Sequence, residues 1–238
     1  MTELPKKMDL YTGPESSCSY LPDQKSTSVF AEPGLPKTKA IQTWLSEQGF
    51  RRSGEFIYRP YCQNCSACLA TRIPIKNFKL SRNQKRTWKK NQDLTVEIKP
   101  AEFDQAHFDL YKRYISSRHA GGGMDNPTTD SYMQFLSSEW SETSFIEFRL
   151  DQKLAAIAVV DQLDNALSAV YTFFDPDLNQ RSLGRYAILY EIDYAQRNNL
   201  EWIYLGYWIK ACQKMSYKQD YQPQEHFING QWSMSDTP

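Results

Sequence analysis

The fold is decided by one stretch of sequence, 143-TSFIEFRLDQKLAAIAVVDQLDNALSAVYTFF-174. It contains three runs rich in β-branched and aromatic residues, at 143–150, 154–162 and 166–174, separated by polar turns at 151–152 and 164–165. Short strands joined by such turns are typical of an antiparallel meander. A helix predicted over 182–198 and an apolar strand over 202–209 then complete a strand–helix–strand unit, which places its two strands in parallel. The sequence therefore predicts an α/β (α+β) fold with a mixed sheet.

The elements predicted upstream of this stretch are shorter. Apolar residues at 41, 44 and 45 predict a helix over 37–48, and further helices are predicted at 82–91, 102–118 and after a cap at Thr128 or Thr129. Strands are predicted at 55–59, 69–75 and 94–99, whereas residues 1–36 are rich in Ser, Pro and Gly and are expected to be mostly irregular. Pro100 marks a predicted boundary between a small cysteine-containing domain, 1–100, and a second domain, 101–238.

The composition excludes several classes of protein. The 238 residues are 40% hydrophobic and 14% aromatic, which is enough for an ordinary globular core. No apolar run approaches the roughly 20 residues of a membrane span, and the N-terminal residues lack the apolar stretch of a signal peptide. We therefore expect a cytoplasmic protein without a membrane partner.

Charge is unevenly distributed along the chain. Residues 57–92 contain nine of the 28 Lys and Arg residues and no Asp or Glu. The other 19 basic residues stand against 28 acidic ones, so the rest of the chain is net negative although the total is neutral. An acid-free basic segment indicates a polyanionic partner such as a nucleic acid, while the alternative is an ordinary solvated surface. The cations predicted to contact phosphates share one helical segment, and they are Arg82, Lys85, Arg86, Lys89 and Lys90.

Three cysteines lie close together in the same segment. Their spacing, Cys62-x-x-Cys65-x-x-Cys68, lets three sulfurs converge, and Cys18 could supply a fourth ligand for zinc or an iron–sulfur cluster. The alternative is a set of reduced, buried thiols beside a tight turn, because a disulfide framework is not expected in a reducing compartment. Metal binding is therefore a conditional prediction.

The segment 181–187, RSLGRYA, lies between a predicted strand and a predicted helix. It resembles the pyrophosphate-binding turn of GNAT-type acyltransferases, in which backbone amides at a helix N-terminus hold the phosphates of coenzyme A. Tyr186 occupies a position where that turn carries a small residue. This difference predicts an acyltransferase scaffold with another donor, such as an aminoacyl-tRNA.

Several motifs resemble those of the arginyl-tRNA–protein transferases, in order from about residue 15 to residue 232. They are CSYLP from Cys18, GFRRSG from Gly49, YRPYCQNCSAC from Tyr58, SRNQKR from Ser81, LYKRY from Leu110, SAVYTFFDPD from Ser168, LGYWI from Leu205 and KMSYK from Lys214. The chain is most similar to the compact bacterial branch of that family. This resemblance implies a GNAT-like domain after the cysteine-containing one, and transfer of leucine from leucyl-tRNA to N-terminal Asp or Glu as a degradation signal (N-degron).

The resemblance also implies roles for particular residues, each with a plainer structural alternative. The cations predicted to bind an acidic N-terminus are Arg51, Arg52, Arg59 and Arg72. The residues predicted to face the aminoacyl end of the tRNA are Lys214, Tyr217 and Lys218. The candidates for proton handling are Tyr171, Tyr207, Glu147 and His119. No cofactor is required for the chemistry, because the donor ester is already activated.

Three other functions fit parts of the sequence. Transfer of arginine would use the same scaffold with a different donor pocket. An acetyl-CoA-dependent N-acetyltransferase would use the turn at 181–187, and a noncatalytic zinc-dependent RNA-binding module would account for residues 57–92 alone.

Overall fold

The computed structural model describes residues 7–118, 121 and 125–234. Within these residues the main sheet has eight strands in the order β14-β13-β7-β12-β11-β10-β9-β8, and a smaller one has the order β1-β4-β6-β5. The strands are β1 (Leu10–Thr12), β2 (Ser16–Ser17), β3 (Lys25–Ser26), β4 (Ser28–Ala31), β5 (Arg51–Ser53), β6 (Phe56–Pro60), β7 (Leu69–Pro74), β8 (Thr95–Pro100), β9 (Glu142–Leu150), β10 (Lys153–Gln162), β11 (Ala166–Phe174), β12 (Trp202–Trp208), β13 (Glu225–Ile228) and β14 (Gln231–Met234). The helices are α1 (Lys39–Glu47), η1 (Ile75–Asn77), α2 (Arg82–Lys90), α3 (Gln105–Arg118), α4 (Thr129–Leu136), η2 (Pro176–Arg181), α5 (Leu183–Arg197) and η3 (Gln213–Asp220).

The predicted meander and the parallel pair are both confirmed. Strands β9, β10 and β11 pair antiparallel in sequence order, and α5 leads from β11 to β12, which lies parallel to β11. The caps at Ser81 and Thr128 are also confirmed, because each side chain accepts a hydrogen bond from the third residue of its helix. The mixed α/β fold class is therefore confirmed.

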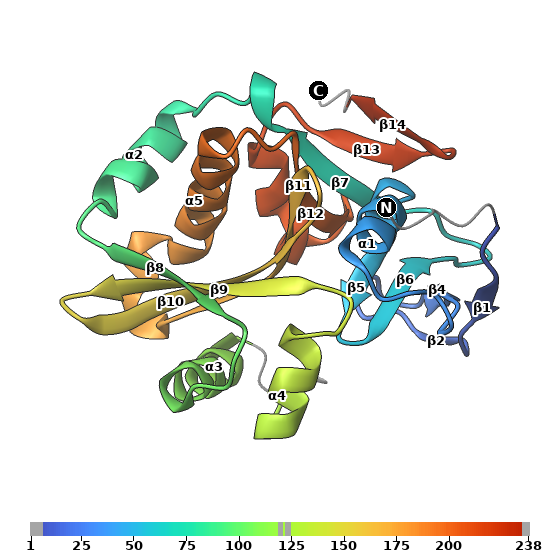
Figure 1. The fold of residues 1–238 in the computed structure, drawn as a ribbon, viewed down its shortest axis with the longest axis horizontal. Coiled ribbons are helices and arrows are strands. Elements are labelled where there is room, and N and C mark those ends of the chain that lie inside the picture. Colours follow the sequence, from blue (N-terminus) through green and yellow to red (C-terminus); the bar gives the residue numbers. More distant parts are fainter. Residues whose placement is uncertain (1–6, 119–120, 122–124, 235–238) are drawn as a thin grey trace.

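Helices cover both faces of the main sheet (Figure 1). Helix α5, with α2 packed outside it, covers one face through apolar residues such as Ile188 and Ile192. Helices α3 and α4 cover the other face, where Ile115 and Leu136 meet Phe145 and Phe173. None of the helices in the described part of the chain combines the length and the apolar character needed to cross a membrane.

The N-terminal segment is more ordered than its composition predicts. The expectation of mostly irregular structure before residue 37 is confirmed for most of the described residues, but four short strands were not predicted. Strands β1 and β4 belong to the smaller sheet, and β2 and β3 form a two-stranded one. The chain from 7 to 60, with α1, packs as a unit beside the main sheet (Figure 1). The strands escaped prediction because they are short and have few apolar residues.

A buried ion pair fastens this unit to the main sheet. Arg52 of β5 holds both carboxylate oxygens of Asp161 on β10, at 2.7 and 2.8 Å. The two side chains are 2% and 0% exposed. Asp161 also accepts hydrogen bonds from Gln42 and Thr143. The orientation of β5 is therefore set by charge pairing as well as by apolar packing.

The main sheet takes strands from both sides of residue 100. Strand β7 lies between β12 and β13, and β8 forms the edge beyond β9. The C-terminal hairpin β13–β14 is absent from the predicted elements, although its turn at Asn229-Gly230, with φ of +51° and +81°, is a typical hairpin sequence. The division of the chain at Pro100 stays a prediction, and the sheet itself is continuous across it.

Candidate active site

Strands β11 and β12 are parallel neighbours that separate along their length. In the described chain their pairing runs from Ala166 with Trp202 only to Ser168 with Tyr204. Beyond this point the carbonyls of Ala169 and Val170 accept hydrogen bonds from Nη2 of Arg51, each at 2.7 Å. Because Arg51 comes from β5, a side chain of the smaller sheet fills the gap in the larger one.

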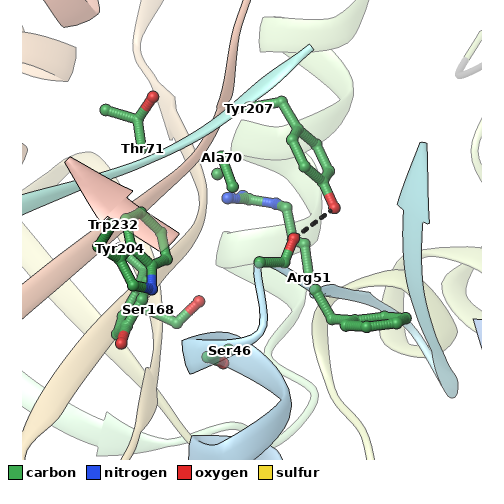
Figure 2. A pocket seen from close by; sticks show the side chains of 11 residues that line it. Ser46, Arg51, Ala70, Thr71, Ser168, Tyr204, Tyr207 and Trp232 are labelled. Carbon is green, nitrogen blue, oxygen red and sulfur yellow. Dashed lines mark hydrogen bonds between the residues drawn. The ribbon is translucent and has the colours of Figure 1, made fainter. Parts of the chain in front are cut away.

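The guanidinium of Arg51 lies directly against Gly206 of β12. A Cβ atom at position 206 would lie 1.7 Å from Nη1 of Arg51, and the φ of Gly206 is +75°. Both features require glycine. Figure 2 shows Arg51 among the residues that line a cavity of about 10 Å³, such as Ala70, Thr71 and Tyr204. That volume is about the space of one water molecule, so a substrate enters only if side chains move.

Arg51 is a partly buried cation with an unused donor in the described structure. Its Nη1 atom is buried and has no hydrogen-bond partner among the residues that the structure describes. Leaving a buried donor unpaired costs about 1–3 kcal/mol, and more when the group is charged. An anion that reached Nη1 would recover this free energy, so the position favours a carboxylate ligand.

Tyrosines line the region beyond Arg51. Tyr171 of β11 contacts Tyr114 of α3 edge-on, with 6.3 Å between the ring centroids. Tyr217 of η3 is in electrostatic reach of Arg51 and Tyr114, and burial raises the pKa of Tyr217 to about 12. The hydroxyl of Tyr171 is buried and has no partner within the described residues. Both phenols are protonated at neutral pH and are therefore available as hydrogen-bond donors.

Lys218 lies beside Tyr217 in sequence and joins the same site. Its Nζ donates to the backbone carbonyl of Tyr207 at 2.5 Å, and Lys218 is 8% exposed. Burial, assisted by the charge of Arg51, lowers the pKa of Lys218 to about 7. The structure thus brings together four predicted site residues from distant segments, namely Arg51, Tyr171, Tyr217 and Lys218.

Glu191 of α5 is a site residue that the sequence interpretation missed. It is 1% exposed, and neither carboxylate oxygen has a hydrogen-bond partner in the described chain. Burial raises the pKa of Glu191 to about 8, although Arg51 acts in the opposite direction. Glu191 follows the helical spacing of the buried residues Ala187, Ile188 and Ala195. An acid at a core position of an amphipathic helix is the feature that could have identified it.

Three of the four predicted substrate-binding arginines are engaged elsewhere. Arg52 is held by Asp161, as described above. Arg72 pairs with Glu225 at 2.7 Å and lies between the rings of Trp202 and Trp232, which attaches the C-terminal hairpin to the sheet. Arg59 donates to the backbone carbonyl that follows α1. These contacts indicate structural roles and leave Arg51 as the arginine at the site.

Tyr207 lines the same cavity as Arg51 (Figure 2), but its hydroxyl is already engaged, whereas Lys214 stays a substrate-binding prediction. The hydroxyl of Tyr207 lies 3.0 Å from the backbone carbonyls of both Gly49 and Tyr58, so it ties β12 to the N-terminal unit. Lys214 lies exposed on η3. His119 lies outside the described residues.

Glu147 belongs to a separate buried network. Its oxygens lie 2.6 Å from His107, 2.8 Å from Lys99 and 2.6 Å from Arg149. Burial alone would raise the pKa of Glu147, but these hydrogen bonds outweigh it and lower the pKa to about 2. Strand β10 separates β9, which carries Glu147, from β11. A fully ionised carboxylate with three partners is poorly suited to accept a proton, so the geometry favours a structural role.

Replacement of Glu147 by glutamine is expected to reduce stability while leaving the chemical step unchanged. Because the folded-state pKa lies below the ordinary value of 4.5, Glu147 stabilises the fold above about pH 4.5 and loses this effect as the pH falls towards 2. Urea unfolding at pH 7 and at pH 3 should show a larger difference between the two proteins at pH 7. A loss of turnover by folded Glu147→Gln protein would contradict the structural assignment.

The basic segment forms an exposed helical surface. All five predicted phosphate-binding residues of α2 are exposed, and none of them lies within 4 Å of a carboxylate in the described structure. The aromatic residues nearby do not share this exposure, since Trp88 packs against Tyr186 and Phe78 lies in the core. The surface can therefore meet phosphates, whereas stacking of bases on Trp88 or Phe78 would require their release from the core.

The cysteines of the N-terminal unit lie near one another without forming a ligand set. Burial raises the pKa of Cys68 to about 11, and the thiols of Cys62, Cys18 and Cys65 add to this rise. Among the described residues, no three His, Cys, Asp or Glu side chains are placed to hold a metal ion. The four thiols are only partly buried, and the raised pKa of Cys68 disfavours the thiolate that a metal needs. The metal stays a prediction, and no chemical step is assigned to it.

The turn that resembles a coenzyme A site is filled by side chains. Tyr186 is 4% exposed and packs against Trp88 and Phe148, with ring centroids 5.4 and 5.5 Å apart. Arg181 pairs with Asp93 at 2.8 Å. The start of α5 therefore lacks the open backbone surface that a pyrophosphate needs.

Comparison with known proteins places the chain in a family. The C terminus of the arginine-tRNA-protein transferases matches residues 106–228, and their N terminus matches residues 16–86. The chain is 50% identical to aspartate/glutamate leucyltransferase of Hahella chejuensis, over 93% of this chain and 95% of the relative, and 52% identical to that of Pseudomonas fluorescens, over 98% of both. The structure of L-PGS from Bacillus licheniformis shares the fold at 8% identity, with a TM-score of 0.50 and coverage of 71% of this chain and 58% of that one. This chain belongs to the arginine-tRNA-protein transferase family.

Proposed function

We propose that this protein transfers leucine from leucyl-tRNA to the N-terminal Asp or Glu of other proteins and so marks them for degradation. The observation that carries the proposal is identity of about half the residues, over nearly the full chain, to relatives named aspartate/glutamate leucyltransferase. Those names favour leucine over arginine as the donor. The proposed place of action is the cytoplasm, where charged tRNA is available.

The gap between β11 and β12 is the proposed place of reaction. The donor ester is already activated, so the α-amine of the acceptor attacks the ester carbonyl without an enzyme nucleophile, and positioning supplies much of the rate. The hydroxyl of Tyr171, which is buried and unpaired in the described structure, is the donor best placed to stabilise the negative oxygen that forms during attack.

Arg51 is the proposed ligand for the acidic side chain of the acceptor. Its Nη1 atom is buried and has no partner in the described structure, so a carboxylate there gains strength because little water competes for it. The pKa of the nearby Lys218 is lowered to about 7, and a bound carboxylate would favour its charged form. An alanine at the acceptor N-terminus would leave Nη1 of Arg51 unpaired, and this difference accounts for selection of Asp and Glu.

Two rival functions are less well supported. An acetyl-CoA-dependent acetyltransferase needs the phosphate-binding surface that Tyr186 and Arg181 fill. A noncatalytic RNA-binding module gives no account of the buried ionisable groups around Arg51.

We also propose that the two parts of the chain on either side of residue 100 have different functions. Residues 1–100 supply Arg51 and the basic helix α2, and residues 101–238 supply Tyr171, Tyr217 and Lys218.

A direct assay tests the donor and the acceptor together. Peptides beginning with Asp, Glu or Ala are incubated with the protein and with leucyl-tRNA, arginyl-tRNA or acetyl-CoA, and the products are weighed by mass spectrometry. We expect one leucine on the Asp and Glu peptides only. An acetyl increment, an arginine increment, or no product from folded protein would contradict the proposal.

Charge removal on α2 is expected to weaken tRNA binding in a salt-dependent way. The triple variant Arg82→Gln, Lys85→Gln, Arg86→Gln removes three exposed cations that lie away from the core. The slope of log K against log salt concentration should become shallower by about one for each lost phosphate contact. The matched control removes three cations elsewhere, Lys25→Gln, Lys39→Gln and Lys112→Gln, and should retain the original slope. Equal slopes in both variants would place tRNA on another surface.

A further inference from the structure

Glu191 differs from the other buried carboxylates of the described chain. Asp161 accepts hydrogen bonds from Arg52, Gln42 and Thr143. Glu147 is likewise held by three side chains. Glu191 alone among the carboxylates buried in the described structure leaves both oxygens unpaired. A buried acid without partners destabilises the fold, and such groups are concentrated at functional sites.

The surroundings of Glu191 connect it to the proposed place of reaction. The titratable groups that face it come from three parts of the chain, namely Arg51 of β5, Tyr217 of η3 and Tyr221 just after η3. On α5 it belongs to the buried face of the helix, with Ala187, Ile188 and Ala195 at helical spacing. Tyr217 is the phenol that has both Glu191 and Tyr114 within electrostatic reach. Glu191 is therefore a buried acid within electrostatic reach of both Arg51 and Tyr217, which are residues of the proposed site.

We propose that Glu191 takes up the proton that the acceptor's α-ammonium must lose, and that the hydroxyl of Tyr217 passes it on. This inference rests on the proposed leucine transfer. In this step the hydroxyl of Tyr217 first turns to hydrogen-bond an oxygen of Glu191, which has no partner in the described structure. The ammonium then gives one proton to the oxygen of Tyr217 as the hydroxyl proton of Tyr217 moves to Glu191. The free amine then forms the amide bond with the leucyl carbonyl, the ester bond to the ribose oxygen breaks, and that oxygen receives a second proton from the nitrogen. Glu191 finally releases its proton to solvent.

The acid–base properties of Glu191 suit this role. A proton acceptor works best when its pKa lies near the working pH. Burial raises the pKa of Glu191 to about 8, which is close to the ordinary range of an α-amine. Tyr217 stays protonated at this pH, so it can pass a proton on without becoming a lasting anion. Glu191 acts through Tyr217 and is a positioning residue for proton transfer.

The test compares Glu191→Gln with Asp193→Asn, which removes a carboxylate from the surface of the same helix. For Glu191→Gln we expect kcat/KM for leucine transfer to fall by roughly 100- to 10,000-fold, with little change in the KM of the peptide. The rise of kcat/KM with pH near neutrality should also disappear. Asp193→Asn should retain the wild-type rate and pH profile. Wild-type kinetics in Glu191→Gln, or a loss of rate with an unchanged pH profile, would overturn the proposal.

A double-mutant cycle tests the route through Tyr217. If both residues serve one proton path, Tyr217→Phe should lower the rate, and adding Glu191→Gln should cause little further loss. Multiplied losses in the double variant would overturn the relay. Failure of the wild-type protein to transfer leucine contradicts the proposed function, whereas normal transfer with an unaffected Glu191→Gln contradicts only this inference.

The thermal stability of Glu191→Gln separates a kinetic effect from misfolding. The folded-state pKa of Glu191 lies above the ordinary value of 4.5. Ionisation of this carboxyl therefore destabilises the wild-type fold increasingly as the pH rises from about 4.5 to about 8. The Tm of Glu191→Gln should equal or exceed that of the wild type, by a margin that widens over this range. A variant that is less stable and less active would place Glu191 in a structural role and overturn the proposal.

Discussion

Replacement of Gly206 by alanine is expected to abolish leucine transfer. The added Cβ would lie 1.7 Å from Nη1 and 2.4 Å from Cζ of Arg51, and the residue has a φ of +75° that alanine rarely adopts. The guanidinium must leave the carbonyls of Ala169 and Val170, which it holds at 2.7 Å. A displacement of about 1 Å in a positioned site costs roughly 100-fold in rate, and this change is larger. Single-turnover transfer to an Asp-initiated peptide measures the loss.

The matched control is Gly34→Ala. No atom lies within 4 Å of the Cβ position at Gly34, and its φ is not in the left-handed region. This variant should retain the wild-type rate and Tm. If Gly206→Ala folds and transfers leucine at the wild-type rate, Arg51 does not have to occupy the gap between β11 and β12, and the proposed acceptor site is contradicted.

Removal of one partner from the buried Arg52–Asp161 pair is expected to cause a large loss of stability. In Asp161→Ala the guanidinium of Arg52, 2% exposed, loses both carboxylate contacts, and Gln42 and Thr143 lose an acceptor. Breaking a buried ion pair in this way costs about 3–5 kcal/mol, a large part of the stability of an ordinary domain. Urea unfolding followed by tryptophan fluorescence measures the change in the free energy of unfolding.

The control breaks an exposed ion pair that also joins the N-terminal unit to the rest of the chain. Glu139 pairs with Lys37 at 2.9 Å, but its side chain is 79% exposed. Glu139→Ala should cost less than about 1 kcal/mol, because water and ions screen such pairs. Similar losses in the two variants would show that the buried Arg52–Asp161 pair contributes no more to stability than an exposed pair. Apolar packing around α1 alone would then hold the unit against the sheet.

These two variants probe different consequences of one arrangement. Arg51 and Arg52 are neighbours on β5, and their side chains point to opposite sides of the strand, as alternation requires. Arg52 fixes the strand to β10 through Asp161, while Arg51 reaches the gap between β11 and β12. We therefore expect Asp161→Ala to lower transfer as well, in proportion to how far β5 moves.

Local pattern was enough to predict most of the fold. The turns at 151–152 and 164–165, the caps at Ser81 and Thr128, and the amphipathic helices depend on interactions within a few residues, and they lie where the pattern places them. The short strands β1 to β4 and the hairpin β13–β14 were missed, because strands of two to four residues are stabilised by partners that are distant in sequence.

The candidate site was predicted less completely than the fold. Arg51, Arg52, Arg59 and Arg72 are alike as sequence features, yet only Arg51 keeps an unpaired donor in the described structure. Glu147 and Glu191 are both buried acids, but among the described residues Glu147 has three partners and Glu191 has none. These distinctions depend on which side chains meet across the molecule.

Periodicity, turn residues, motif order and charge are properties of the chain, so they were enough to predict the mixed α/β architecture, the family and the acid-free basic segment. Only the folded molecule reveals that β11 and β12 separate, that Arg51 fills the gap against Gly206, and that Glu191 is buried without a partner among the described residues. Burial and pairing set the charge and reactivity of an ionisable group, and they arise only when segments far apart in sequence pack together.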